Sequence, residues 1–274
     1  MNTLLIPTDF SPVADNALTY ALNMAKAYQL DITLFHVVQV SNLITPDAVY
    51  LDSIPGYEAQ ANEKMDEKVA FLKAQYPDLN ITHKVTTGLF LDSMKDFCDE
   101  INPVALVMGI TGDGGAVDKI IGSNAVLAMN SLAYPMIVVP KQGQFKPLQK
   151  ICMACDLRQV VTSTPLLPIK AFVKLTNAEL HLLNIDFNNR HFTPETADEL
   201  KTLDDMLDSV EHKFHFIDNE NIQEAIDDFI TREHMDLLIM IPKKHSFFDS
   251  LFHKSKTKEM LYHSHIPVLA LHQR

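Results

Sequence analysis

Short apolar runs alternate with amphipathic stretches along the whole chain. In the first half the runs are LLIP from Leu4, ITLFHVV from Ile32, THKVTT from Thr82, ALVMGI from Ala105 and MIVV from Met136. The early runs are almost continuously hydrophobic, which is typical of parallel strands buried on both faces. Residues 14–28, 63–75 and 91–101 carry apolar positions at helical spacing. This alternation predicts a parallel sheet with right-handed helical crossovers.

The same pattern occurs a second time later in the chain. Asp9 and Asp156 each end an apolar run and lie 147 residues apart. The repeated prolines Pro135 and Pro267, before the last apolar run of each half, lie 132 residues apart. The sequence therefore predicts two tandem domains, which we place at 1–144 and 145–274 around the polar segment KQGQFKPLQ.

The two repeats differ in length. His36 and Asn184, in the second apolar run of each half, are still 148 residues apart, so the offset falls by about 16 residues before the prolines. The extra residues fit Ser41–Gln60, a stretch with two prolines, a glycine and no clear period. We interpret this stretch as a long loop beside the functional site.

Composition and charge narrow the class of protein. The 274 residues are 47% hydrophobic, which allows each half a core of its own, and no apolar run is long enough to span a bilayer. The net charge of -12 argues against sequence-independent binding to nucleic acid. Three cysteines make no disulfide framework, and the start MNTLLIPTDF has no basic region before its apolar run. We expect a cytoplasmic protein with no nucleic-acid or membrane partner.

Most of the chain's glycines lie in one segment. VMGITGDGGAVDKIIGSNA, from Val107, follows a predicted strand and holds five of the eight glycines. Glycine lets the backbone approach a ligand closely, successive N–H groups can form an anion-binding nest, and the next helix adds further N–H donors. Ser123 is expected to cap that helix and to offer its hydroxyl to the same anion. The segment therefore favours a phosphate site, and the alternative is a tight strand–helix connection that binds nothing.

The glycine spacing identifies a family resemblance. Gly109-x2-Gly112-x9-Gly122-Ser123 fits neither the Walker pattern nor the dinucleotide fingerprint. Together with LVMG before it, YPMIVVP after it and the opening IPTDFS, it resembles the universal stress protein family, once per repeat. The resemblance implies two open five-stranded parallel sheets of strand order 3-2-1-4-5 with helices on both faces. It also implies ATP beyond strands one and four, where the strand order reverses.

The resemblance further implies roles for individual residues. Pro7 and Asp9 would lie at the adenosine side, and the backbone of Val37 would face the adenine edge. The implied phosphate-binding residues are Gly109, Gly112, Gly122 and Ser123, assisted by Asn124. Asp113 departs from the family pattern, because its carboxylate would repel a triphosphate unless Mg²⁺ or Lys119 intervenes.

The second repeat has lost the glycines. Ile241, Lys244 and Lys254 stand where the first repeat has Gly109, Gly112 and Gly122, so we expect no ATP there. Residues 243–254 instead interleave lysines and histidines with phenylalanines. This basic segment could be an anion site, an interaction patch, or a short amphipathic helix packed on its own sheet.

Other candidate chemistry is weaker. Cys152 and Cys155 form a CxxC, but it falls within a predicted strand, where residues three apart point to opposite faces, so we interpret it as structural. Cys98 and His36 are expected in the core, His36 with a hydrogen bond. His263 and His265 lack a well-spaced partner, so we predict no metal site. No nucleophile–base set is recognisable, which predicts at most slow hydrolysis of ATP.

The sequence therefore predicts an ATP-binding stress-response regulatory protein with one nucleotide site, in the first repeat. Nucleotide would order the glycine segment, and an unidentified protein partner would detect that state. The alternative is a scaffold that binds no nucleotide and acts through the surface of the second repeat. The runs from Met136 and Val268 are predicted to pair edge to edge, giving an intrachain pseudo-dimer. Assembly into a homodimer is also compatible with the sequence.

Overall fold

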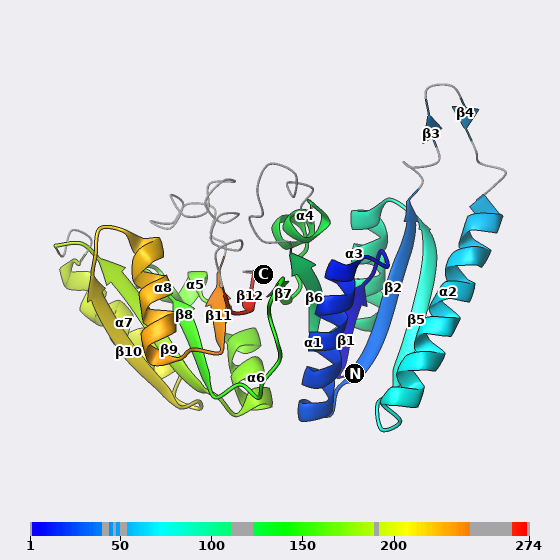
Figure 1. Cartoon of the computed structure of the whole chain (residues 1–274). Coiled ribbons are helices and arrows are strands. Elements are labelled where there is room, and N and C mark those ends of the chain that lie inside the picture. Colours follow the sequence, from blue (N-terminus) through cyan, green and yellow to red (C-terminus); the bar gives the residue numbers. More distant parts are fainter. Residues whose placement is uncertain are drawn as a thin grey trace. The chain divides into compact units, whose positions relative to one another are not determined.

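The computed structural model describes residues 2–39, 44–45, 48–49, 54–110, 123–188, 192–241 and 265–272. The chain divides into two compact units (Figure 1). The first unit is Met1–Gly109 with Gly122–Tyr134, and the second is Ile110–Ile121 with Pro135–Arg274. Among the described residues, no helix combines the length and the apolar character that a membrane crossing needs.

The first unit alternates strands and helices, as the apolar pattern predicted. Its elements are β1 (Thr3–Pro7), α1 (Pro12–Tyr28), β2 (Asp31–Gln39), β3 (Ile44–Thr45), β4 (Ala48–Val49), α2 (Ile54–Gln75), β5 (Ile81–Gly88), α3 (Phe90–Ile101), β6 (Ala105–Ile110) and α4 (Ser123–Ser131). The main sheet runs β5-β2-β1-β6, and these neighbouring strands pair in parallel. If the short strands β3 and β4 are left out and the four strands are numbered along the chain, the order is 3-2-1-4, so the direction of winding reverses between β1 and β6.

Helices cover both faces of the first sheet. Because parallel crossovers are right-handed, α1 and α2 lie on one face, whereas α3 and α4 lie on the other. An ion pair from Lys68 of α2 to Asp15 of α1 joins the first pair, and α3 contacts α4. The core between these layers contains Leu4, Leu5 and Ile6 of β1, all fully buried.

The segment Ser41–Gln60 is not a loop throughout, which corrects the sequence-based expectation. Ile44–Thr45 and Ala48–Val49 pair as a short antiparallel hairpin, and α2 already begins at Ile54. The early start is compatible with the sequence because a proline is tolerated in the first turn of a helix. From Ala61 onward, α2 buries Met65, Val69 and Leu72 at helical spacing.

The second unit repeats the arrangement. Its elements are β7 (Met136–Pro140), β8 (Lys150–Ala154), α5 (Val160–Ser163), α6 (Leu166–Thr176), β9 (Glu179–Asp186), α7 (Pro194–Met206), β10 (His212–Asp218), α8 (Ile222–Glu233), β11 (Leu237–Met240) and β12 (Val268–Ala270). The sheet runs β10-β9-β8-β11-β12, which is the order 3-2-1-4-5. The expected fold class, two tandem doubly wound α/β halves, is confirmed.

The last strand of the first repeat belongs to the second unit. β7 pairs antiparallel with β12, with Ile137 opposite Leu269 and Met136 opposite Ala270. The predicted pairing of these two edge strands is therefore confirmed. The compact units follow this pairing, whereas the domain ranges 1–144 and 145–274 follow the sequence repeat and stay a prediction.

Candidate functional site

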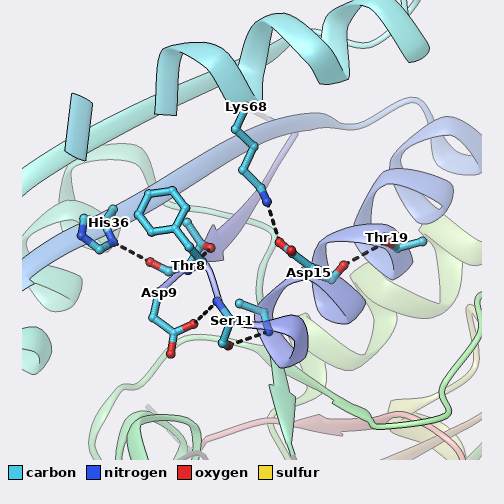
Figure 2. Close-up of polar contacts among 9 residues, drawn as sticks. Thr8, Asp9, Ser11, Asp15, Thr19, His36 and Lys68 are labelled. Carbon is cyan, nitrogen blue, oxygen red and sulfur yellow. Dashed lines mark hydrogen bonds and ion pairs between the residues drawn. The ribbon is translucent and has the colours of Figure 1, made fainter. Parts of the chain in front are cut away.

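A tight turn after β1 forms the centre of the candidate site (Figure 2). The Asp9 carboxylate accepts from the Ser11 backbone N–H at 3.0 Å, and the Thr8 hydroxyl accepts from the Phe10 N–H at 3.1 Å. Phe10 takes a left-handed conformation, with φ of 63°. Ser11 then caps α1 by accepting from the Ala14 N–H at 3.2 Å. These local bonds fix the direction of the exposed Asp9 side chain at the end of β1.

His36 ties this turn to β2. Its Nδ1 lies 2.7 Å from the carbonyl oxygen of Thr8. A carbonyl can only accept, so Nδ1 carries the proton and Nε2 is left as an acceptor in the neutral ring. The ring also lies against Phe10, with centroids 4.8 Å apart. The predicted hydrogen bond of His36 is confirmed, although the ring is half-buried rather than in the core.

Two lysines of α2 reach the same region. Lys68 Nζ lies 2.5 Å from an Asp15 carboxylate oxygen, next to the start of α1 (Figure 2). Lys64 Nζ lies 5.8 Å from the centre of the Phe10 ring, within the range of a cation–π contact. Positive charge from α2 therefore lies beside the turn that carries Asp9. Neither the glycine spacing nor the apolar pattern of the sequence indicates Phe10, Lys64 or Lys68.

Gly109 is required by a close approach between β6 and α1. A Cβ at this position would overlap the carbonyl oxygen of Val13 and would lie 2.8 Å from the Cγ1 of the same residue. Such a contact with backbone cannot be relieved by a change of rotamer. The first glycine of the predicted phosphate motif thus serves helix–strand packing, and it brings the end of β6 next to the turn after β1.

The other predicted site residues divide into two groups. Pro7 is buried at the end of β1, Val37 is buried in β2, and Asn124 is half-buried in α4. Ser123 is the first residue of α4, which agrees with the expected helix start. The remaining positions, Gly112, Asp113, Lys119 and Gly122, lie outside the described residues, as does the basic segment 243–254.

The second unit copies the turn almost bond for bond. Asn184 donates to the carbonyl of Cys155 at 3.0 Å, as His36 does to that of Thr8. The Asp156 carboxylate accepts from the N–H two residues later at 3.2 Å, as the Asp9 carboxylate does. Leu157 is left-handed, with φ of 50°, at the position of Phe10. The two halves therefore share the geometry of this turn, and not just its sequence pattern.

The helix that follows the turn differs between the halves. In the second unit α5 has four residues, and the carboxylate of Glu199 from α7 accepts from the N–H groups of Gln159 and Val160 at 3.2 and 2.8 Å. In the first unit the equivalent helix has 17 residues and begins with a proline, which has no N–H. Ile241, buried at the position of Gly109, adds a side chain where the first unit has none.

The remaining sequence candidates have structural surroundings. Cys98 is buried in α3, as expected, and burial raises the pKa of its thiol to about 12. Cys152 is fully buried in β8, which also raises its thiol pKa and makes it a poor nucleophile. Across the part of the chain that the structure describes, no group of three or more His, Cys, Asp or Glu residues could hold a metal ion.

The fold and the turn define a Rossmann-like α/β protein with its candidate site beyond β1 and β6. Residues 1–140 match the model of the universal stress protein family, so the chain belongs to that family. Universal stress protein MJ0531 of Methanocaldococcus jannaschii is 25% identical over 139 residues, which are 50% of this chain and 81% of that protein.

Solved structures extend the likeness to the second half. A universal stress protein from Archaeoglobus fulgidus matches 100% of this chain and 99% of its own, with a TM-score of 0.75 at 17% identity. At that identity the match shows the fold alone. A universal stress protein in complex with cAMP matches 47% of this chain and 100% of its own, with a TM-score of 0.38 at 14% identity. That likeness is too low for its ligand to be carried over.

Proposed function

We propose that the first half of the chain binds one adenine nucleotide, ATP, just beyond the carboxyl ends of β1 and β6. Open α/β sheets bind ligands where the strand order reverses, and in the first unit this point lies between β1 and β6. The observation that carries the proposal is that an exposed carboxylate, Asp9, follows β1 while a glycine, Gly109, lies near the end of the neighbouring strand β6. Asp9 is oriented by its own turn, and Gly109 holds β6 and α1 too close together for any side chain.

Asp9 is suited to bind a sugar hydroxyl. One carboxylate oxygen, Oδ1, accepts from Ser11 and keeps the side chain in place. Among the described contacts the second oxygen is unused, so it can accept a hydrogen bond from a ribose hydroxyl. Pro7 ends β1, and Val37 lies two residues before the end of the neighbouring strand β2; both would lie on the adenosine side in this proposal.

The phosphates would lie toward α4. Ser123 begins this nine-residue helix, whose first N–H groups lack partners within the helix and whose dipole is positive at that end. Gly109, Gly112 and Gly122 would bring backbone N–H groups to the phosphates, with Asn124 beside them. Mg²⁺ would accompany the triphosphate because Asp113 places a carboxylate in the same segment.

The second half would bind no nucleotide. The equivalent of Gly109 is the buried Ile241, and Glu199 already takes up the amides at the start of α5. The protein would act in the cytoplasm as a regulator, with a protein partner that recognises the nucleotide-bound first half. In this proposal the chain is at most a slow ATPase.

Calorimetric titration of the nucleotide-stripped chain with Mg-ATP, ADP and AMP tests the proposal. We expect one ATP per chain. Asp9→Asn should weaken binding by roughly ten- to a hundredfold, the range for a hydrogen bond to a charged group. The matched control is Asp156→Asn, which changes the same turn in the second half and should leave the affinity unchanged.

A second variant tests the phosphate side. Gly122→Ala with Ser123→Ala should abolish nucleotide binding while Cys98 and the core of α3 stay protected from solvent. Two ATP molecules per chain would contradict the assignment of a single site. Absence of binding to all three nucleotides would overturn the proposal and favour an interaction protein, for which Leu167 and Val161, 80% and 66% exposed on the second unit, offer apolar contact surface.

A further inference from the structure

Four polar side chains form a continuous network at one margin of the second sheet. Glu179 and His181 come from β9, and Lys213 and His215 come from the edge strand β10. The parallel register places Lys213 opposite His181, so all four side chains lie on one face of the sheet. His181 Nδ1 lies 2.9 Å from His215 Nε2, and His181 Nε2 lies 3.1 Å from a Glu179 carboxylate oxygen.

Helix α8 closes over this network. The rings of His181 and His215 stack with centroids 5.0 Å apart, and the ring of Phe229 from α8 lies 4.8 Å from that of His215. Lys150 of β8 donates to the carbonyl of Glu233 at 3.1 Å and holds the end of α8 on the same face. His181 is 3% exposed, so water has little access to the inner part of the network.

The hydrogen bonds limit how many protons the two rings can share. The carboxylate of Glu179 can only accept, so His181 donates through Nε2. The contact between His181 Nδ1 and His215 Nε2 needs one donor and one acceptor. It therefore survives when the pair is neutral and when it holds one extra proton. With two extra protons, both nitrogens carry hydrogen and the contact becomes a repulsion between two stacked cations.

Charged groups from each packed element act on the pair. Glu179 of β9 lies 2.5 Å from Lys213 of β10, so its negative charge is shared with that lysine. On α8, Glu233 favours positive charge at His215, whereas Arg232 lies over the ring of Phe229. Burial, followed by the charge of His181, nevertheless lowers the pKa of His215 below its ordinary value. The surroundings therefore disfavour the doubly protonated pair.

We propose that the His181–His215 pair is a pH-sensitive contact that holds α8 on the β9–β10 margin at neutral pH and releases it when both rings are protonated. Acidification would thereby loosen one edge of the second half. The proposed response to acid lies in the half that we expect to bind no nucleotide. The proposal therefore does not depend on nucleotide binding.

Amide hydrogen exchange of the full chain tests this proposal. Between pH 7.5 and 5.5, after correction for intrinsic exchange, protection of residues 225–230 in α8 should fall as the pH falls, by at most about tenfold per pH unit, because the released state binds one more proton than the closed state. His215→Phe keeps an aromatic ring against Phe229 but has no titratable nitrogen, so this loss should disappear. The matched control is His212→Gln on the same strand, because His212 binds Asp204 of α7 on the opposite face and should not matter.

Nitrogen NMR of the imidazoles provides a readout that needs no variant. In the wild-type chain we expect the pKa of His215 to lie below its ordinary value, because of burial and the charge of His181, and protonation of this ring to accompany the loss of α8 protection. The proposal is overturned if both rings become protonated while α8 protection is unchanged. It is equally overturned if His215→Phe folds and retains the full loss of protection on acidification.

Discussion

His36 Nδ1 lies 2.7 Å from the carbonyl oxygen of Thr8 and joins β2 to the turn that carries Asp9. The second half makes the same connection with an asparagine, Asn184 to Cys155. A histidine and an asparagine are interchangeable here because each offers one N–H donor at a similar distance from the backbone. The bond is therefore a shared requirement of the turn.

This equivalence predicts the effect of two substitutions. His36→Asn should keep the donor and change the free energy of unfolding of the first unit little, whereas His36→Leu should lower it by about 1–3 kcal/mol because the Thr8 carbonyl loses its partner. Urea denaturation of the two variants measures the difference. His83→Leu is the control. Among the described ion pairs, His83 takes part in one, with the exposed Asp66 at 3.6 Å. Equal losses from both His36 variants would contradict the equivalence.

The approach of β6 to α1 predicts that Gly109 tolerates no side chain. Gly109→Ala should lower the free energy of unfolding by about 1–3 kcal/mol, the usual cost of overpacking, because the new Cβ meets backbone atoms of Val13. It should also weaken ATP binding, since β6 must move away from the turn. Thermal unfolding and calorimetry test the two effects.

Gly56→Ala is a matched control for that substitution. Gly56 lies in α2, and a Cβ added there would have no other atom within 4 Å, so alanine should raise the free energy of unfolding by about 0.4–1 kcal/mol. A stable Gly109→Ala chain with unchanged ATP affinity would contradict the packing argument.

The carboxylate of Glu199 predicts a stability effect confined to the second half. Glu199→Ala leaves the Gln159 and Val160 N–H groups without their acceptor, which should cost about 1–3 kcal/mol. The ATP stoichiometry should stay at one per chain. Lys201→Ala, at an exposed position of the same helix, is the control and should change stability by less than about 0.5 kcal/mol. A second ATP site in the Glu199 variant would show that this carboxylate excludes a ligand.

The contacts of the Asp236 carboxylate predict that the stability of the second unit depends on pH. Its buried carboxylate accepts from the N–H groups of Gln149 and Lys150 and pairs with Lys146 at 2.7 Å, which fixes the chain entering β8. Burial alone would raise its pKa, but Lys146 and the two amides outweigh burial and lower the pKa from its ordinary 3.8. Because the folded chain binds the proton less readily than the unfolded chain, this contribution is complete above about pH 4 and is lost as pH falls further.

Urea denaturation between pH 7 and pH 3 measures that contribution. Asp236→Asn should lower the free energy of unfolding by about 1–3 kcal/mol at pH 7 and reduce its fall on acidification. Asp208→Asn removes a carboxylate that is 74% exposed and pairs with Lys170, and it should do neither. The same acid dependence in the Asp236 variant as in wild type would contradict the assignment.

The sequence by itself determined the order of elements and their repetition. Runs such as ALVMGI and MIVV are short, continuously apolar and bounded by turn residues, which is typical of strands buried on both faces, so β6 and β7 were predictable from the sequence. The start of α2 was not predictable in this way, because residues 55–60 are mostly exposed and have no apolar stripe to indicate a helix.

The tertiary structure alone decided which distant residues meet. Four contacts depend on chain segments that folding brings together: Phe10 with His36, Gly109 with Val13, the Glu199 carboxylate with the start of α5, and His181 with His215. Periodicity records which face of an element is buried, but it carries no information on which side chain of another element lies against that face. The sequence therefore determined the two-fold repeated scaffold, while contacts between elements made its two halves chemically different.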